Sequence, residues 1–322
     1  VVPKEVGEMH HLLPTTLDPP AHRPFRTLLN ENLAPKAIRG LEDKIREQAV
    51  DLIESFRSQG QCDFISQYAA EFPIRIFMSI VDLPMTDAPR LKYLTDHISR
   101  PDGSMTLAEA KQQCFASLGP LVDARMGADG TDMLSRLVNG VVDGRPITRT
   151  EALEITTQII IAGLDTVVNF LGFVMQFLAT DSEHRRQLVA NPDLIPVAVE
   201  ELIRRYPLVT IAREVKEDMA FAGVQLKAGE MMLIASPLHG IDPRANKDPF
   251  KIDFNRTDSA HTTFGNGPHR CPGANLARTE IRVTMEEWLA RIPEFEIEPG
   301  FKVKYHGGIV GCVDKLPLIW KP

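Results

Sequence analysis

One long apolar segment, residues 148–179, constrains the fold of this chain more than any other feature. It opens on Thr148-Arg-Thr-Glu151, a capping box in which hydroxyl and carboxylate each satisfy a backbone N–H that the first helical turn leaves free. Helical periodicity then continues to about Ala179, a length of roughly 48 Å at ~1.5 Å per residue. We therefore expect one central helix with the remaining elements arranged around it.

The most apolar part of this segment, from Ile159 to Phe177, is long enough to raise the question of a membrane span. Asp165 lies at its centre, where a carboxylate would cost ~2.5–3.5 kcal/mol on insertion scales. No cluster of Lys or Arg flanks the segment, as commonly happens at the cytoplasmic end of a span. The pattern favours a helix buried in a protein core and no membrane association.

The rest of the chain is also mainly helical, with short strand-like pieces in its second half. An irregular stretch rich in Gly, Pro, Asn and Asp, residues 239–270, is long enough to indicate a functional loop. The predicted fold class is mainly α with small β-sheets, in a single domain over residues 1–322. Helices are expected at 22–29, 41–56, 72–81, 107–124, 131–138, 196–205 and 272–290, and strands at 219–221, 224–226, 231–234 and in the 295–322 tail.

Composition argues against several partners and locations. With 36 Lys+Arg against 43 Asp+Glu the net charge is −7, and no basic stripe offers a surface for nucleic acid. Cys62, Cys114, Cys271 and Cys312 are far apart and form no CxxC pair, which is typical of a reduced, cytoplasmic protein. The chain starts at Val1 without an initiator Met or a signal peptide, so we expect a trimmed N-terminus or a fragment. We expect a monomer.

The segment 264–273 carries the most informative chemistry. Cys271 lies directly before a predicted helix, and the free N–H groups of a helix N-terminus stabilise a thiolate. Gly265 loosens the loop, and Gly273 removes a side chain where a flat cofactor would approach the backbone. A buried structural cysteine is the simplest alternative, and a thiol nucleophile activated by His269 is another. Zinc is disfavoured because no other Cys or His stands at ligand spacing.

Three motifs, in the family's own order, resemble those of the cytochrome P-450 superfamily. They are the FxxGxxxCxG haem-binding loop at Phe264, Gly267, Cys271 and Gly273, the ExxR pair at Glu201 and Arg204 with Arg256 joining it, and the oxygen-binding groove at 162–166. Within the superfamily the chain is similar to the bacterial camphor 5-monooxygenases over its whole length, most clearly in the runs 100–106, 163–171, 261–265 and 287–293. The resemblance implies the cytochrome P-450 fold, with an N-terminal segment of the usual chain, including strands of its main sheet, absent.

The resemblance also implies that the chain binds haem b, with Cys271 as the axial ligand of the iron. Thiolate ligation pushes electron density onto the iron and favours O–O cleavage, which is a property of oxygenases. Phe264 would pack beside the sulfur, with plain core packing as the alternative. Glu201 and Arg204 would form a structural ion pair behind the haem. Further haem contacts are implied at Gly163, Gly265 and Gly273, and a propionate clamp at His22, Arg26, Arg213 and His269.

Asp165 and Thr166 lie in the middle of the central helix among apolar neighbours. A buried carboxylate needs a partner, and no cationic residue stands at helical spacing from Asp165. The Thr166 hydroxyl can bond back to the carbonyl four residues earlier, and Ala162 and Gly163 are small enough to admit a ligand there. We interpret the two residues as a proton-delivery pair, in which Thr166 would hydrogen-bond the dioxygen and Asp165 would connect to solvent.

Substrate positions follow from the resemblance alone. It implies a pocket lined by Val1, His10, Leu12, Gln158, Ile161, Val209 and Ile309. His10 stands where the camphor enzymes use a tyrosine to bond the substrate ketone, Gln158 adds polarity at an apolar position, and Ile211 replaces an acidic residue near a propionate. We therefore expect a small apolar substrate, terpenoid or ketone-bearing, with camphor itself as an alternative.

The function that we predict is a haem-thiolate monooxygenase that inserts one atom of O2 into a C–H bond. Its two electrons would come from a [2Fe–2S] ferredoxin, supplied by a flavin reductase that uses NADH. Arg23, Arg26 and Arg270 could steer an acidic ferredoxin to the proximal face, the alternative being a propionate or surface role. A haem-based sensor or carrier without turnover is a second hypothesis. A third, an enzyme that rearranges peroxides or dehydrates oximes, is disfavoured by the Asp165–Thr166 pair, because such chemistry needs no proton relay to dioxygen.

Overall fold

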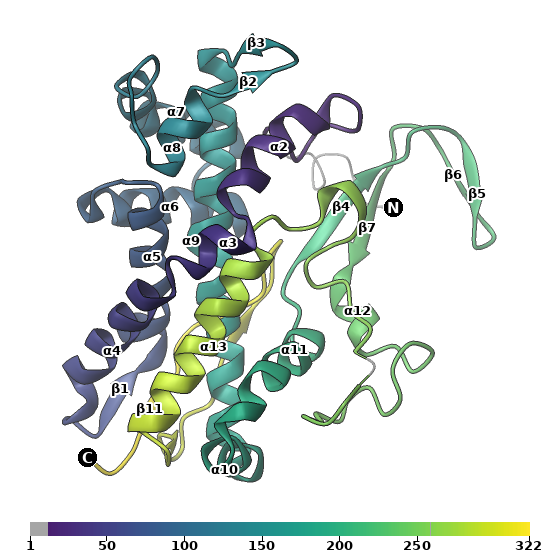
Figure 1. Cartoon of the computed structure of the whole chain (residues 1–322). Coiled ribbons are helices and arrows are strands. Elements are labelled where there is room, and N and C mark those ends of the chain that lie inside the picture. The colour runs from purple at the N-terminus through teal and green to yellow at the C-terminus, as the bar shows by residue number, and fades with distance from the viewer. Residues whose placement is uncertain (1–11, 258) are drawn as a thin grey trace.

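The longest element of the protein is α9 (Arg149–Thr180), the helix expected from the capping box. The fold is given by a computed structural model that describes residues 12–257 and 259–322. Thr148 Oγ1 accepts a hydrogen bond from the Glu151 N–H at 3.3 Å, and the Glu151 carboxylate accepts one from the Thr148 N–H at 2.8 Å. Both halves of the predicted box therefore form, and α9 runs through the middle of the molecule (Figure 1).

Among the described residues α9 is also the one helix that is long and apolar enough to cross a membrane. However, 61% of its apolar window is buried inside the structure. Core helices of soluble proteins combine the same length and apolarity with burial of this kind.

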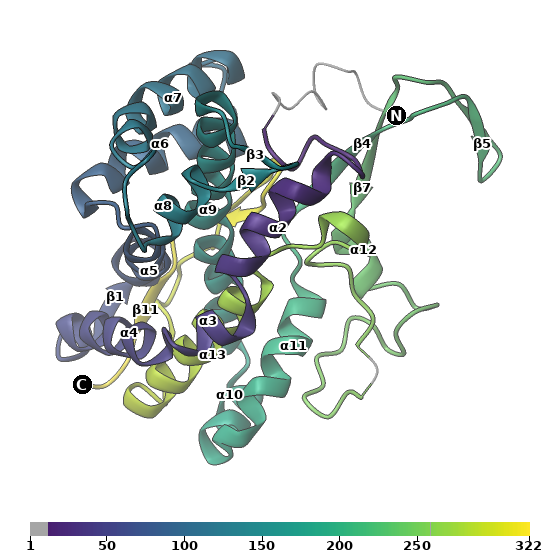
Figure 2. The same ribbon diagram turned by 45° about the horizontal axis from the view of Figure 1, so that its top comes forward.

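Helices surround α9 on several sides (Figures 1 and 2). α5 (Phe72–Ile80), α6 (Ala88–Ser99) and α7 (Leu107–Asp123) pack directly against it. α13 (Ala274–Arg291) packs on α4 (Glu42–Arg57) and on α11 (Ile195–Arg205). The other helical pieces are α2 (His22–Asn32), α3 (Pro35–Arg39), α8 (Met133–Val138), α10 (Ser182–Ala190), α12 (Ser236–Gly240), the π turn Ile65–Ala69, and the 3-10 turns Met85–Asp87, Pro192–Leu194 and Gly267–His269.

The strands are short and form small antiparallel sheets. One sheet has three strands in the order β1, β11, β8, and the others are pairs: β4 with β7, β5 with β6, β9 with β10, and β2 with β3. The strand bounds are β1 Gln61–Asp63, β2 Val141–Val142, β3 Arg145–Pro146, β4 Thr210–Glu214, β5 Met219–Phe221, β6 Val224–Leu226, β7 Met231–Ala235, β8 Glu296–Ile297, β9 Tyr305–His306, β10 Cys312–Val313 and β11 Pro317–Ile319.

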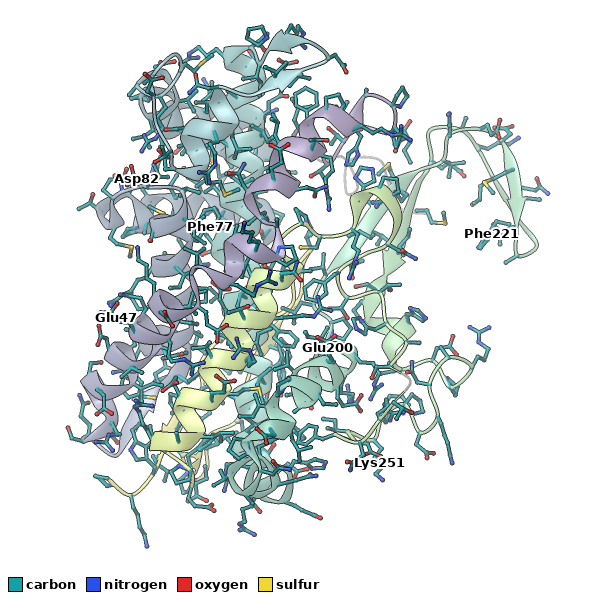
Figure 3. All side chains as sticks on the ribbon, viewed as in Figure 1. Glu47, Phe77, Asp82, Glu200, Phe221 and Lys251 are labelled. Atoms are coloured by element: carbon teal, nitrogen blue, oxygen red, sulfur yellow. The ribbon has the colours of Figure 1, made fainter. Side chains whose placement is uncertain are left out.

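The β5–β6 hairpin stands away from the rest of the molecule, with Phe221 exposed on it (Figure 3). Its two-residue turn, Ala222 and Gly223, has positive φ at both positions, +49° and +80°. Such a turn matches the twist of the flanking strands, and the glycine reaches this conformation without strain.

Aromatic packing fixes the position of α13, the helix that follows the cysteine loop. The fully buried Trp288 contacts Phe64 at 5.2 Å, Phe295 at 5.7 Å and Trp320 at 5.9 Å between ring centroids. Tyr68 donates a hydrogen bond from its hydroxyl to Thr284 Oγ1 at 3.0 Å. These contacts join α13 to the first third of the chain and to its C-terminal tail.

The predicted fold class is confirmed, and the predicted helices and hairpin form with their ends shifted by at most a few residues. The prediction missed the longer helices α6 and α10, the five-residue helices α3 and α12, and the strands β1 to β4. The apolar residues of α6 and α10 are sparse and mixed with charges, so the local pattern is weak. The pairing of β1 with β11 joins opposite ends of the chain, and no local signal could have shown it.

Candidate active site

The loop 264–273 is closed by its own backbone. The Cys271 N–H donates to the Phe264 carbonyl at 2.7 Å, and Gly265 and Gly267 adopt φ of +71° and +65°, values that glycine reaches readily. α13 starts at Ala274, so Cys271 lies just before the first turn. The local sequence therefore presents the cysteine at a helix N-terminus, as expected.

The Cys271 side chain is accessible to solvent although protein atoms surround it on most sides. Burial raises the pKa of the Cys271 thiol, while the Gly273 N–H and the guanidinium groups of Arg26, Arg278 and Arg270 act in the opposite direction. A side chain at position 273 would stand 3.8 Å from the sulfur, an ordinary contact. The other three cysteines are buried free thiols.

Three of the four predicted propionate residues lie together beside this loop. The His22 and His269 rings are 4.5 Å apart, and Arg26 follows His22 by one turn of α2. His22 is buried, and burial lowers its pKa, as do the neighbouring His269 and Arg26. Its Nε2 has no hydrogen-bond partner among the described residues, whereas Asp18 lies 3.6 Å from His269 Nε2. The cluster therefore contains a buried polar atom that still needs a partner.

The fourth predicted residue, Arg213, lies on β4 and not in this cluster. Its exposed guanidinium bonds the Ala212 carbonyl at 2.8 Å, and within the described ranges no contact joins it to His22 or Arg26. Ile211, the departure from the family pattern, faces Ile234 across the β4–β7 pair.

Two of the three arginines predicted for a partner surface line a shallow depression of about 260 Å³. Arg26, Arg270 and Cys271 line the depression, and Arg26 donates to the Arg270 carbonyl. Arg23 is exposed on α2, one turn before Arg26.

Asp165 has a cationic partner that the sequence interpretation missed. Arg100, at the end of α6, donates to both carboxylate oxygens of Asp165 at 2.7 and 2.8 Å, and Lys92 lies 3.6 Å away. Asn169 donates a further bond at 2.9 Å. Lys92, Asp96 and Arg100 follow one another at four-residue spacing, so the charged stripe of α6 was the available signal. Burial lowers the pKa of Arg100, but its bonds to Asp165 outweigh that effect and raise it.

The Thr166 hydroxyl donates to the Ala162 carbonyl at 3.0 Å. This is the bond back to the carbonyl four residues earlier that the sequence analysis considered. Gly163 has a packing partner: a Cβ there would stand 2.4 Å from the Phe77 ring of α5. The missing side chain thus lets α5 approach α9, and a contact of Gly163 with a cofactor stays a prediction.

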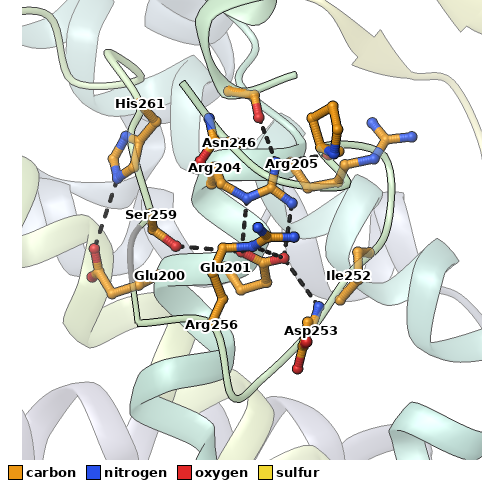
Figure 4. Close-up of polar contacts among 12 residues, drawn as sticks. Glu200, Glu201, Arg204, Arg205, Asn246, Ile252, Asp253, Arg256, Ser259 and His261 are labelled. Atoms are coloured by element: carbon orange, nitrogen blue, oxygen red, sulfur yellow. Dashed lines mark hydrogen bonds and ion pairs between the residues drawn. The ribbon is translucent and has the colours of Figure 1, made fainter. Parts of the chain in front are cut away.

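Glu201 and Arg204 form a fully buried ion pair on α11 (Figure 4). Arg204 donates to the two Glu201 oxygens at 2.7 and 2.8 Å, and Arg256 donates to both at 3.1 Å. Burial raises the pKa of Glu201, but bonds from Arg204, the Asp253 N–H and Arg256 outweigh that effect and lower it. The ion pair therefore fastens part of the irregular 239–270 stretch to α11.

The predicted substrate residues are only partly brought together. Val209 forms an isolated bridge with Val310, next to Ile309, whose N–H bonds the Ser99 carbonyl at 3.2 Å. Gln158 and Ile161 are one turn apart on α9, and Gln158 Oε1 is buried without a partner among the described residues. Leu12 is buried, and Val1 and His10 lie outside the described residues.

Comparison with known proteins decides the family. The family model described as Cytochrome P450 matches residues 107–304. The chain belongs to the cytochrome P450 family. It is 34% identical over 316 residues to "Probable cytochrome P450 127A1" of Sinorhizobium fredii, covering 98% of this chain and 76% of that protein. It is 30% identical over 302 residues to "Cytochrome P450(BM-1)" of Priestia megaterium, covering 91% and 74%.

Solved cytochrome P450 structures share the fold. The crystal structure of CYP101J2 matches 100% of this chain and 81% of its own, with a TM-score of 0.92 and 47% identity. The crystal structure of CYP101C1 matches 97% and 79%, with a TM-score of 0.87 and 39% identity. The predicted fold and the predicted enzyme class, a cytochrome P450 monooxygenase, are therefore confirmed.

A cytochrome P450 uses a haem, and the residues of this chain fit one. Cys271 offers an accessible sulfur at a helix N-terminus, and Gly273 leaves space beside it. The unpartnered His22 Nε2, together with Arg26 and His269, supplies donors that suit an acidic group.

Proposed function

We propose that this cytochrome P450 is a haem-thiolate monooxygenase in which Cys271 provides the axial thiolate. The geometry of the cysteine loop supports this proposal most directly. Cys271 is held at the start of α13 by the hydrogen bond from its N–H to the Phe264 carbonyl and by the Gly273 N–H beside the sulfur. A thiolate-ligated haem activates dioxygen and supplies the insertion of one oxygen atom into a C–H bond. In this proposal His22, Arg26 and His269 hold the propionates, and Arg213 assists from β4.

Proton delivery is proposed for Asp165 and Thr166. The Thr166 hydroxyl carries a proton at Oγ1, which it donates to the Ala162 carbonyl and can turn toward the open side of α9. Asp165, at the preceding position of the helix, is held by Arg100 and Lys92, which are both nearer to solvent than the carboxylate. In this proposal Arg100 and Lys92 orient the Asp165 carboxylate, and the carboxylate passes a proton from solvent toward Thr166.

The substrate that we propose is a small apolar molecule, terpenoid or ketone-bearing. Ile161 and Val209 are apolar, and Gln158 has one buried unpartnered oxygen. Apolar walls with a few placed polar groups are typical of sites for such ligands. The identity of 47% and 39% to CYP101J2 and CYP101C1, with the motif runs that resemble camphor monooxygenases, supports a place in that class.

A [2Fe–2S] ferredoxin, reduced with NADH through a flavin reductase, is the electron donor that we propose. Arg26 and Arg270 line the depression that reaches Cys271, and the exposed Arg23 extends the positive surface along α2. Cations around a redox site attract an acidic partner and raise its association rate. A cytoplasmic location accords with these soluble partners.

The test is the difference spectrum of the reduced protein with carbon monoxide. A red-shifted thiolate Soret band is expected for the haem-loaded protein and is lost in Cys271→Ser. Cys312→Ser, which changes another free cysteine, serves as the control and keeps the band. A normal band in Cys271→Ser contradicts the assignment. NADH consumption that never depends on substrate, with the band intact, supports the sensor or carrier instead.

A further inference from the structure

Arg278 lies over the ring of Phe264, the residue whose carbonyl closes the cysteine loop. Its guanidinium carbon stands 4.6 Å from the centre of the Phe264 ring, within the range of a cation–π contact. Arg278 is on α13, two turns after Cys271, and Phe264 accepts the hydrogen bond from the Cys271 N–H. The cation, the aromatic ring and the sulfur-bearing residue are therefore linked through contacts within one small region.

Glu200 of α11 fixes the orientation of this cation. Its two carboxylate oxygens accept from Arg278 Nε and Nη2, the latter at 3.0 Å, in a bidentate pair. His261 Nε2 lies 3.9 Å from the same carboxylate (Figure 4). His261 Nδ1 accepts from the Thr263 N–H at 3.3 Å, which leaves its Nε2 on the side of Glu200.

The two charges of the pair are both present at neutral pH. Burial raises the pKa of Glu200, but the neighbouring His261 and the hydrogen bonds from Arg278 outweigh that effect and hold it at about 2. The guanidinium of Arg278 faces Phe264, whereas the carboxylate lies on the side of α11. The pair is therefore an oriented dipole with its positive end toward the cysteine loop.

A structural role alone leaves this orientation unexplained. The adjacent Glu201 already fastens α11 to the irregular stretch through Arg204 and Arg256. Arg282, one turn further along α13, makes comparable ion pairs with Glu42 and Glu286 but has no contact with Phe264 among the described residues. Arg278, unlike Arg282, is among the cations that act on the Cys271 thiol.

We propose that the Glu200–Arg278 pair sets the reduction potential of the iron ligated by Cys271, Arg278 raising it and Glu200 lowering it. Arg278 is a positioning and tuning residue that acts through Phe264 and through its field at the sulfur. One-electron reduction adds negative charge at the site, so a nearby cation favours the reduced state and a nearby carboxylate disfavours it. This inference rests on the proposed haem-thiolate function and adds the residues that regulate it.

The opposite signs of the two charges give a test that structural damage cannot imitate. Arg278→Gln is expected to lower the potential, and Glu200→Gln to raise it, each by about threefold to tenfold in the ferric–ferrous equilibrium, or ~30–60 mV at 59 mV per tenfold. The effect is modest because the side chains are 27% and 38% exposed, and solvent screens the charges. Disruption of the loop would move both variants in the same direction.

The experiment is a dye-mediated spectroelectrochemical titration of the haem-loaded wild type and variants, with dithionite as reductant. Arg278→Lys keeps the charge and is expected to stay near the wild-type potential. The double variant Glu200→Gln/Arg278→Gln is expected to return toward it, and Arg282→Gln, the matched control, to leave it unchanged. Higher ionic strength should shrink both single-variant shifts.

The outcomes separate this inference from the proposed function. If the wild type lacks the thiolate Soret band, the proposed function fails. If the band is present but the two single variants shift together or not at all, only the tuning role is overturned. Should Arg278→Gln fail to take up haem, Glu200→Gln and Arg278→Lys still decide, because an unchanged potential in Glu200→Gln contradicts the proposal.

Discussion

Arg100 binds Asp165 with both ends of its guanidinium, at 2.7 and 2.8 Å, and so joins α6 to the middle of α9. The Asp165 side chain is 1% exposed and the Arg100 side chain 17%, so the pair is shielded from solvent. Removing one member of such a pair leaves the other charge in a poorly solvated place. The stability of the helical core and the proton route proposed for Asp165 therefore depend on the same contact.

Replacement of Arg100 should show this dependence. Arg100→Gln is expected to lower the free energy of unfolding by about 2–4 kcal/mol, less than a fully unpaired charge would cost because Lys92 and Asn169 remain beside Asp165. Urea denaturation followed by circular dichroism measures the change. Lys227→Gln breaks an exposed pair with Asp218 and should cost under about 1 kcal/mol. Equal stability of the two variants would contradict the assigned strength of the buried pair.

Removal of the Thr166 hydroxyl tests proton delivery. Thr166→Ala is expected to keep consuming NADH while the electrons are diverted to hydrogen peroxide, because the proton donor nearest the centre of α9 is lost. The measurement is the ratio of peroxide to NADH consumed. Thr180→Ala removes a hydroxyl that bonds back to the Gln176 carbonyl at the far end of the same helix, and should leave the ratio unchanged. Unchanged coupling in Thr166→Ala would end the relay proposal.

The cysteine loop and the central helix could be predicted because their signals are local. Cys271 stands among glycines before a helix, and Thr148 with Glu151 forms a complete capping box. The partner of Asp165 could not be found in this way, since Arg100 is 65 residues away at the end of a helix that the apolar pattern failed to indicate. The packing of Phe77 on Gly163 depends in the same way on the approach of two helices, which no spacing within either one reveals.

Glu280 makes stability depend on pH with a sign opposite to that of most carboxylates. Its burial on α13 raises the pKa from 4.5 to about 8. The folded protein therefore keeps a proton on Glu280 that the unfolded chain loses. The contribution of this proton to the free energy of unfolding is complete below about pH 4.5 and is lost as the pH rises toward 8.

Glu280→Gln should remove this loss. At pH 8 the variant is expected to be more stable than the wild type by about 2–4 kcal/mol, and near pH 5 the two should be nearly equal. Denaturant titrations at several pH values measure the difference. Glu47→Gln, at an exposed position on α4 (Figure 3), is the control and should follow the wild type. Parallel curves for wild type and Glu280→Gln would show that Glu280 does not titrate in this range.

Gln158 is expected to govern the polarity of the bound substrate. Gln158→Leu removes a buried oxygen that has no partner among the described residues, so it should raise stability by ~1 kcal/mol. It should also tighten binding of a purely hydrocarbon cyclic terpene by about threefold to tenfold. The reason is that the bound hydrocarbon no longer covers a side-chain oxygen that it cannot hydrogen-bond. Spin-state titrations with a hydrocarbon terpene and with a terpenoid alcohol measure the change. Equal gains for both ligands would indicate a size effect.

Ionic strength tests the proposed ferredoxin surface. Arg23 and Arg270 are exposed beside the depression that contains Cys271, and Arg26 is tied to the Arg270 carbonyl, so the first two can change without loss of that bond. Arg23→Gln and Arg270→Gln are each expected to slow reduction by an acidic ferredoxin by about threefold to thirtyfold at low salt. The difference in reduction rate between each variant and the wild type should disappear near 1 M salt, where the Debye length falls to about 3 Å.

Stopped-flow reduction across a salt series measures this effect. Arg186→Gln changes an exposed cation on α10, far from α2 in both views (Figures 1 and 2), and should match the wild type at every salt concentration. Because the net charge of the whole chain is −7, a general attraction to an acidic partner is ruled out, and any acceleration at low salt must come from a local positive surface. A wild-type rate that does not fall with salt would therefore place the partner elsewhere on the molecule.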